Sequence, residues 1–255
     1  MQRFVGTFLV IVVCLAFFAS PVNAGDVLNP GDIAIIGFNF DNDDEFAFVC
    51  LKEISAGTEI RFTDQGWKST GGFLDVDNEG LLSWEAPSTG CKLGEIVKIR
   101  VLDFTSNIKF SINGDQILAY QFINSSPKFI FALNSDGFNW TDATGENNSA
   151  IPTGLDGSNS IALVEIDNAI YTGNKSFTTT ADALAAIVNI NNWSGSDSRM
   201  VIPTIPFSFT TTAVHLSDFS AETGEETASW WIIAGLVIVP VLIMVVKRPK
   251  RNCCN

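Results

Sequence analysis

An uncharged run of seventeen residues near the carboxyl end constrains this chain most. It reads WWIIAGLVIVPVLIMVV from Trp230 to Val246, and four basic residues follow between positions 247 and 251. Charged side chains are costly in hydrocarbon, so this order predicts a membrane-spanning helix and its stop signal. The helix would cover about 25 Å of a hydrocarbon core of about 30 Å, so flanking Trp, Lys and Arg side chains must reach the two interfaces. We therefore expect residues 230–246 to be a permanent membrane anchor.

A second hydrophobic segment, at the amino-terminal end, is of a different kind. Arg3 precedes an apolar run from Phe4 to Phe18, and small residues follow at the positions that a signal peptidase reads, up to Ala24. We expect a signal peptide over residues 1–24 that is cleaved after Ala24. An uncleaved anchor is the alternative interpretation.

The two hydrophobic ends together predict a type I topology, with the main domain outside the cytoplasm. The expected location is the plasma membrane or another membrane of the secretory route, with the ectodomain outside or lumenal. The predicted parts are a signal peptide (1–24), an ectodomain (25–215), an acidic stalk (216–229), a transmembrane helix (230–246) and a basic cytoplasmic tail (247–255).

The segment between the two hydrophobic ends, residues 25–229, is strongly acidic. It contains all 28 Asp and Glu residues and ten Lys or Arg residues, which gives a formal charge of −18. Such a surface repels phosphate backbones, so nucleic acid is excluded as a partner and cations are favoured. The chain also has 20 Gly and 20 Phe residues, a composition typical of strands and turns.

Short apolar runs separated by turn residues predict an all-β ectodomain. The runs IAIIGFNF and FAFVCL, joined by the acidic DNDDE, predict a strand pair whose second member is buried on both faces. Other runs alternate apolar and polar residues as half-buried strands do. One short helix is expected where ADALAAIV follows Thr178–Thr180, because a Thr can cap it. We predict a single β-sandwich with one short helix, plus the transmembrane helix.

Cysteine usage agrees with export. The ectodomain keeps only Cys50 and Cys91, and two cysteines in an oxidising compartment predict one disulfide, with two unpaired thiols as the alternative. Closing a loop of about forty residues would stabilise the fold by about 4 kcal/mol on the chain-entropy model. Cys253 and Cys254, beside the basic end of the predicted span, form a candidate S-palmitoylation site.

Several of these runs together carry a family resemblance. The stretch GDIAIIGFNFDNDDEFAFVCLKEISAGTEIRFTDQGW, followed by EGLLSW, GDQILAY, FIFALN and NSAIPTGLDGSNSIAL, resembles a β-rich domain of large secreted and surface proteins of bacteria and some microbial eukaryotes. The resemblance covers residues 30–175, and in general look the domain is similar to immunoglobulin-like sandwiches such as lamin-tail domains. It implies an all-β extracellular module and carries over no catalytic residue.

Two acidic clusters could bind a metal ion. Clustered carboxylates at loop ends are the oxygen ligands that Ca²⁺ prefers, although neither cluster fits the EF-hand pattern. The alternative is a solvated acidic turn that protects strand edges from association. The candidate Ca²⁺ ligands are Asp41, Asp43, Asp44 and Glu45 in the first cluster, and Asp75, Asp77 and Glu79 in the second.

Aromatic residues and sequons point to surface contacts. Trp140 and Trp193 lie in polar stretches and could stack against sugar rings, whereas such residues more often fill a core. Five N-x-[ST] motifs predict N-glycosylation, and in a eukaryote the glycans would leave the flank built by residues 30–110 free. These motifs begin at Asn124, Asn139, Asn147, Asn174 and Asn192.

Catalytic patterns are scarce. The only histidine, His215, lies near the predicted membrane, and no G-x-S-x-G or Cys/His nucleophile motif is present. We expect no enzyme activity but a surface protein for recognition or adhesion, with a protein or carbohydrate ligand. A structural coat or envelope component is the alternative. A carboxylate-dependent hydrolase is a more distant one, since 28 acidic residues always allow some pair.

Overall fold

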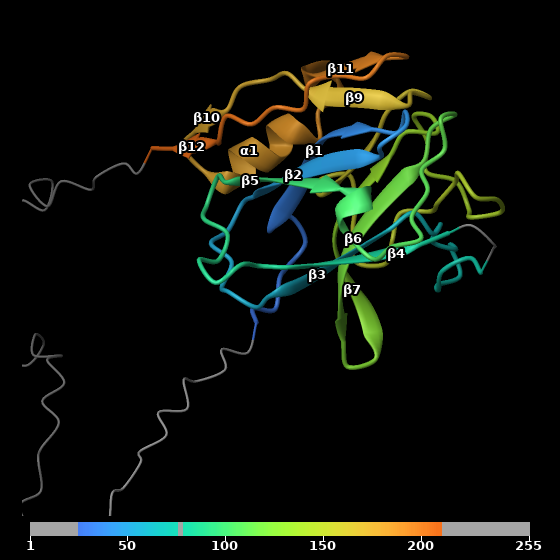
Figure 1. Cartoon of the computed structure of the whole chain (residues 1–255), viewed down its shortest axis with the longest axis horizontal. Coiled ribbons are helices and arrows are strands. Elements are labelled where there is room, and N and C mark those ends of the chain that lie inside the picture. Colours follow the sequence, from blue (N-terminus) through green and yellow to red (C-terminus); the bar gives the residue numbers. More distant parts are fainter. Residues whose placement is uncertain (1–24, 76–78, 211–255) are drawn as a thin grey trace, which may run out of the picture. The chain divides into compact units, whose positions relative to one another are not determined.

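The computed structural model describes residues 25–75 and 79–210, and this region has a β-rich fold, as predicted (Figure 1). The predicted signal peptide, stalk, transmembrane run and tail, with Cys253 and Cys254, lie outside the described residues. So does Asp77. Within the described part of the chain, no helix combines the length and apolar character that crossing a membrane requires.

Two five-stranded sheets make up most of the domain. The first has the order β11-β9-β1-β2-β5 and the second has the order β4-β3-β6-β7-β8. The first sheet consists of β1 (Ile33–Asn39), β2 (Glu45–Cys50), β5 (Ile96–Arg100), β9 (Asn168–Tyr171) and β11 (Trp193–Ser196). The second consists of β3 (Glu59–Thr63), β4 (Leu81–Glu85), β6 (Gln116–Ile123), β7 (Ser126–Asn134) and β8 (Ser160–Ala162). A small parallel pair joins β10 (Ser176–Phe177) to β12 (Ser208–Phe209), and two 3₁₀ turns are η1 (Val101–Asp103) and η2 (Ile190–Asn192).

The β1–β2 hairpin is the centre of the first sheet. Its strands pair antiparallel from Ile33 opposite Cys50 to Asn39 opposite Glu45. Every residue of both strands is buried, because one face packs against the second sheet and the other lies beneath later segments of the chain. The predicted burial of the second strand on both faces is therefore confirmed.

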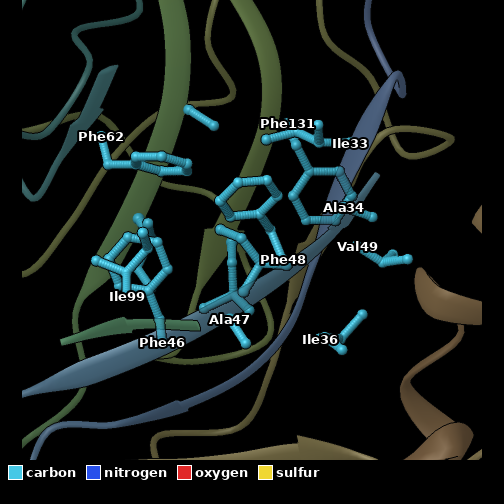
Figure 2. Packing of buried hydrophobic residues seen from close by; sticks show 14 of the residues in the cluster. Ile33, Ala34, Ile36, Phe46, Ala47, Phe48, Val49, Phe62, Ile99 and Phe131 are labelled. Atoms are coloured by element: carbon cyan, nitrogen blue, oxygen red, sulfur yellow. The ribbon is translucent and has the colours of Figure 1, made fainter. Parts of the chain in front are cut away.

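The core lies between the two sheets. Phe46 and Phe48 of β2 contact Phe62 of β3, with ring centroids 4.9 and 5.3 Å apart. Figure 2 shows these rings together with Phe131 of β7. Burying one such side chain stabilises the folded state by about 1.5–3 kcal/mol relative to leaving it exposed, so this aromatic layer is a main source of cohesion between the sheets.

The one α-helix among the described residues, α1, forms where the sequence predicts it, over Thr180–Ile187. Its N-cap is Thr179, whose hydroxyl accepts a hydrogen bond from the main-chain N–H of Asp182 at 3.1 Å. Ala183 and Ile187 are buried, and the helix contacts β1. The helix thus covers part of the outer face of the first sheet.

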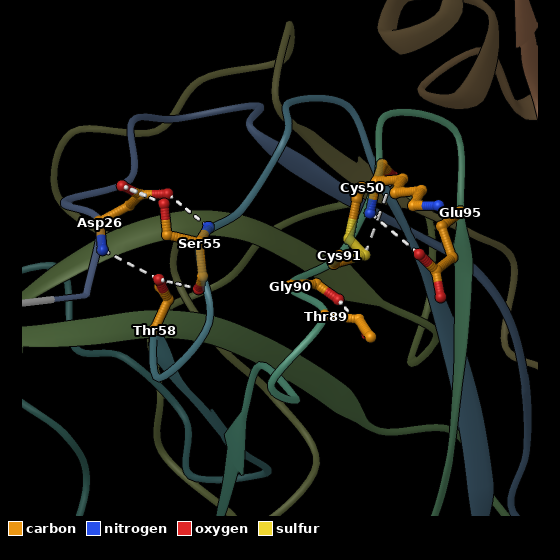
Figure 3. Close-up of a disulfide and its surroundings, with 9 residues drawn as sticks. Asp26, Cys50, Ser55, Thr58, Thr89, Gly90, Cys91 and Glu95 are labelled. Atoms are coloured by element: carbon orange, nitrogen blue, oxygen red, sulfur yellow. Dashed lines mark hydrogen bonds between the residues drawn. A yellow bond between two sulfur atoms is a disulfide. The ribbon is translucent and has the colours of Figure 1, made fainter. Parts of the chain in front are cut away.

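The predicted disulfide between Cys50 and Cys91 is present, with the two Cα atoms 6.5 Å apart. Figure 3 shows it where the chain crosses between the sheets. Cys50 ends β2, and Cys91 precedes β5. A two-hydrogen-bond bridge between Ile54 and Cys91, at 2.8 and 2.9 Å, pairs the same two crossovers. The bond therefore joins the outgoing and returning connections between the sheets.

Candidate functional site

The acidic loop Asp41–Glu45 has cationic partners from other parts of the chain. Glu45 is 3% exposed, and its carboxylate lies 2.7 Å from Lys98 Nζ and 2.8 Å from Arg199 Nη2. Burial raises the pKa of Glu45, but hydrogen bonds from Lys98 and Asn39 and the charges of Lys98 and Arg199 outweigh it, so the pKa falls below its usual range. The charged form of Glu45 is thus stabilised.

Arg199 also organises the main chain of this loop. Its Nη1 donates to the carbonyl oxygens of Asp41 and Asp43, at 3.0 and 3.1 Å. The guanidinium therefore binds two main-chain carbonyls of the loop and one of the carboxylates that the sequence offered to Ca²⁺, that of Glu45. We did not predict this role from the sequence, where Arg199 is the one basic residue between 194 and 215.

The second predicted cluster is divided in the structure. Asp75 is exposed, Asp77 lies outside the described residues, and Glu79 is buried. The acidic neighbours of Glu79 in the structure were not predicted from the sequence. They come close because β3 pairs with both β4 and β6, which places Thr63 beside Leu81 and Leu118. The end of β3 and the beginnings of β4 and β6 therefore lie at one end of the second sheet. This brings together a carboxylate cluster of Asp64, Glu79 and Asp115.

Two members of the carboxylate cluster accept main-chain hydrogen bonds. Asp64 accepts from the N–H groups of Gly80 and Lys109 at 2.5 and 2.9 Å. Asp115 accepts from those of Ser111 and Gln116 at 2.8 and 2.7 Å. These bonds tie the β3–β4 and β5–β6 connections to the same sheet end and fix the orientation of both carboxylates.

The carboxylate cluster is buried without a cation. Asp64, Glu79 and Asp115 are 1%, 8% and 2% exposed, and the ion pairs of the described residues all lie elsewhere. Burial, followed by the charges of Asp64 and Asp115, raises the pKa of Glu79 to about 9. Burial also raises the pKa values of Asp64 and Asp115. In the described ranges, no group of three or more His, Cys, Asp or Glu side chains is arranged so that it could hold a metal ion.

A second candidate site is an apolar groove between the β8 edge of the second sheet and the β11 edge of the first. It has a volume of about 260 Å³. Three large apolar side chains in it are well exposed: Phe138 by 59%, Val164 by 50% and Ile190 by 44%. The apolar groove is lined by Phe138, Leu163, Val164, Ile166, Ile190 and Trp193, with Asn191 as a polar group.

The two candidate sugar-binding tryptophans have different surroundings. Trp140 is half-buried and packs against a small cluster that includes Trp67 and Phe129. Trp193 begins β11 instead of lying in a polar loop, and its indole N–H donates to the carbonyl of Ile187 at 2.7 Å. Trp193 lines the apolar groove and Trp140 does not, so of the two only Trp193 is placed to contact a ligand there.

The five sequon asparagines lie at or near the surface. Asn124, Asn139 and Asn174 are exposed, whereas Asn147 and Asn192 are half-buried. The side-chain amide of Asn192 donates to the carbonyl of Ala186 at 2.8 Å, and that of Asn147 donates to the Ser111 hydroxyl at 3.0 Å. A glycan on either of these two nitrogens would alter an existing hydrogen bond.

Comparisons with protein-family models, with curated proteins and with solved structures found no match to this chain.

Proposed function

We propose that this chain is a single-pass type I surface protein whose β-sandwich ectodomain recognises a carbohydrate outside the membrane. The observation that carries the proposal is the apolar groove, where Phe138, Val164 and Ile190 are exposed together. Scattered apolar side chains are normal on a protein surface, but a cluster of them marks a binding site. The Cys50–Cys91 disulfide supports export, since such bonds persist in oxidising compartments.

The composition of the groove favours an uncharged sugar. Flat aromatic faces such as those of Phe138 and Trp193 pack against the CH groups of a sugar ring, and Asn191 offers hydrogen bonds. The formal charge of −18 over residues 25–229 disfavours anionic glycans. The groove is slightly smaller than the 300–1,000 Å³ or so typical of sites for drug-sized ligands, so it fits the end of a glycan chain.

A glycan array with the full chain in detergent tests this function. We expect Phe138→Ala to weaken binding about tenfold, the equivalent of about 1.4 kcal/mol, because it removes an exposed stacking surface. Phe122→Ala is the matched control, since Phe122 is 50% exposed and is absent from the groove lining. A folded wild-type protein that binds no neutral glycan would overturn the proposal.

The alternatives give different results in the same preparation. Self-association that is concentration-dependent and weakened by Val164→Ser would favour the coat component, because the groove would then contact another copy. Hydrolysis of an arrayed glycan that Glu79→Gln abolishes would favour the hydrolase. Burial of Asp64 and Glu79 argues against the latter, as a substrate must reach the reacting carboxyl groups.

A further inference from the structure

The rim of the apolar groove carries one of the N-x-[ST] motifs. Asn139 begins this motif, Thr141 ends it, and Asn139 directly follows Phe138, the groove residue that is 59% exposed. Consecutive Cα atoms are about 3.8 Å apart. A sugar attached to Asn139 therefore starts one residue away from the groove.

One buried residue holds this motif against another part of the groove. Asn134 is 2% exposed, and its side-chain amide donates to the carbonyl oxygens of Gly137 and Asn139, at 3.2 and 3.3 Å. The carbonyl oxygen of Asn134 accepts a hydrogen bond from the main-chain N–H of Leu163, a groove residue, at 2.8 Å. Asn139 and Leu163 are thus bonded to the same residue, which fixes the motif beside the groove.

The side chain of Asn139 is accessible for attachment of a glycan. Asn139 and Thr141 are exposed, and the bond to Asn134 uses the main-chain carbonyl of Asn139. Attachment joins Nδ2 to the anomeric carbon of a lipid-linked sugar diphosphate, as Nδ2 loses one proton and the diphosphate leaves. The other motif at the groove is less well placed, because Asn192 is half-buried and its Nδ2 donates to the carbonyl of Ala186.

We propose that an N-glycan on Asn139 lies over the apolar groove and competes there with glycans from outside. Its first sugars pack against the exposed faces of Phe138, Val164 and Ile190. The groove lining contains no charged side chain, which suits uncharged sugars. This inference rests on the proposed function, since it names a regulator of the same groove.

Attachment to the chain gives the glycan of Asn139 an advantage over a free one. A ligand on a short flexible tether has an effective concentration in the millimolar range, so even a weakly bound sugar occupies the groove for much of the time. The apparent affinity for an external glycan is then reduced in proportion to the fraction of molecules whose groove is free. Removal of the tethered glycan restores that affinity.

Variants of the full chain, produced in a eukaryotic secretory host and purified in detergent, test the inference. Asn139→Gln and Thr141→Ala remove the same glycan by different changes. Asn124→Gln is the matched control, since it removes an exposed motif at the tip of the β6–β7 hairpin. Peptide mapping of the wild type should find Asn139 glycosylated. Both groove variants should bind an arrayed neutral glycan about fivefold more tightly than the wild type, and the control should not.

A second measurement needs no external ligand. Loss of the glycan through Asn139→Gln should lower Tm by about 2 to 4 °C, because the glycan covers exposed apolar surface. The same change should lower Tm by less than about 1 °C in a Phe138→Ala background, where the packing surface is already gone. Asn124→Gln should shift Tm equally in both backgrounds.

The outcomes separate this inference from the proposed function. Unmodified Asn139, measurable array binding that is equal in the wild type and both groove variants, or a Tm shift that is independent of Phe138 would overturn the inference. So would tighter array binding in Asn192→Gln alone. An array that no variant binds, together with a Tm shift that depends on Phe138, would overturn recognition of external glycans and leave the glycan of Asn139 as the occupant of the groove.

Discussion

Glu45 and Glu79 are the same residue type and both are buried, yet their pKa values are displaced in opposite directions. The difference comes from neighbours distant in sequence: Glu45 meets Lys98 and Arg199, and Glu79 meets Asp64 and Asp115. A sequence shows how many acids a loop contains, but it does not show which side chains fold onto them. This is why the acidic loops could be recognised from the sequence, while Arg199 and Asp115 could not be assigned to them.

Arg199→Ala should destabilise the protein by about 2 kcal/mol at neutral pH, since it leaves a buried carboxylate with one cation fewer. The folded-state pKa of Glu45 is lowered from 4.5, so the stability from its charge is present above pH 4.5 and is lost as the pH falls through the folded pKa. Urea denaturation at pH 7 and at about pH 3 should show a smaller difference between the two proteins in acid. An unchanged difference would show that Arg199 acts through the carbonyls of Asp41 and Asp43 alone.

Asp44→Asn should stabilise the protein, whereas Arg199→Ala should destabilise it. Burial, aided by the charge of Asp64, raises the pKa of Asp44 to about 6. The hydrogen bond that the Phe110 main-chain N–H donates to its carboxylate at 3.2 Å lowers the pKa but does not offset burial. The raised pKa means that stability falls as the pH rises from 3.8 through 6. The variant should therefore be more stable by about 1 kcal/mol at pH 7.5, after allowance for solvent screening, and unchanged near pH 3.5. Equal denaturation midpoints for both proteins at pH 7.5 would contradict this explanation.

Secondary-structure elements are predictable here in proportion to their length and periodicity. The β1–β2 hairpin and α1 carry strong local patterns and were expected. The strands β10, β11 and β12 have two to four residues each, too few for alternation to be recognised, and they exist because their partners hold them. Trp193 was misplaced in a loop for this reason, since β11 forms by pairing with β9.

Thr179→Ala should destabilise the domain by about 1 kcal/mol, because it removes the oxygen that accepts from the Asp182 N–H. Thr178→Ala is the matched control, as Thr178 is exposed and precedes the N-cap; its effect should stay within about 0.5 kcal/mol. Chemical denaturation of the three proteins measures both values. Equal losses in the two variants would show that the cap contributes nothing specific.

At the scale of the whole molecule, sheet topology creates the sites. Asp64, Glu79 and Asp115 converge because β3 pairs with β4 on one side and β6 on the other. Likewise, the apolar groove needs the outer strands of both sheets, β8 and β11. An all-β class follows from composition and pattern, but strand order between sheets depends on long-range packing that no local signal contains.

Cys91→Ser should lower the free energy of unfolding by about 2 to 4 kcal/mol, since the bond closes a loop of 41 positions. The main-chain bridge between Ile54 and Cys91 should persist and keep the crossover geometry, so the variant should still fold. Guanidinium denaturation with and without reductant measures the loss, and reduction of the wild type should reproduce it. A variant that matches the oxidised wild type would show that the bond is energetically neutral.

The same disulfide determines how the molecule responds to proteolysis. The exposed loop Ser69–Gly72 lies between Cys50 and Cys91 in the sequence. A protease that cuts there leaves two fragments, one ending in the loop after β3 and the other beginning before β4, but the disulfide keeps them in one covalent unit. A nicked molecule would therefore migrate as a single band until reductant separates its halves.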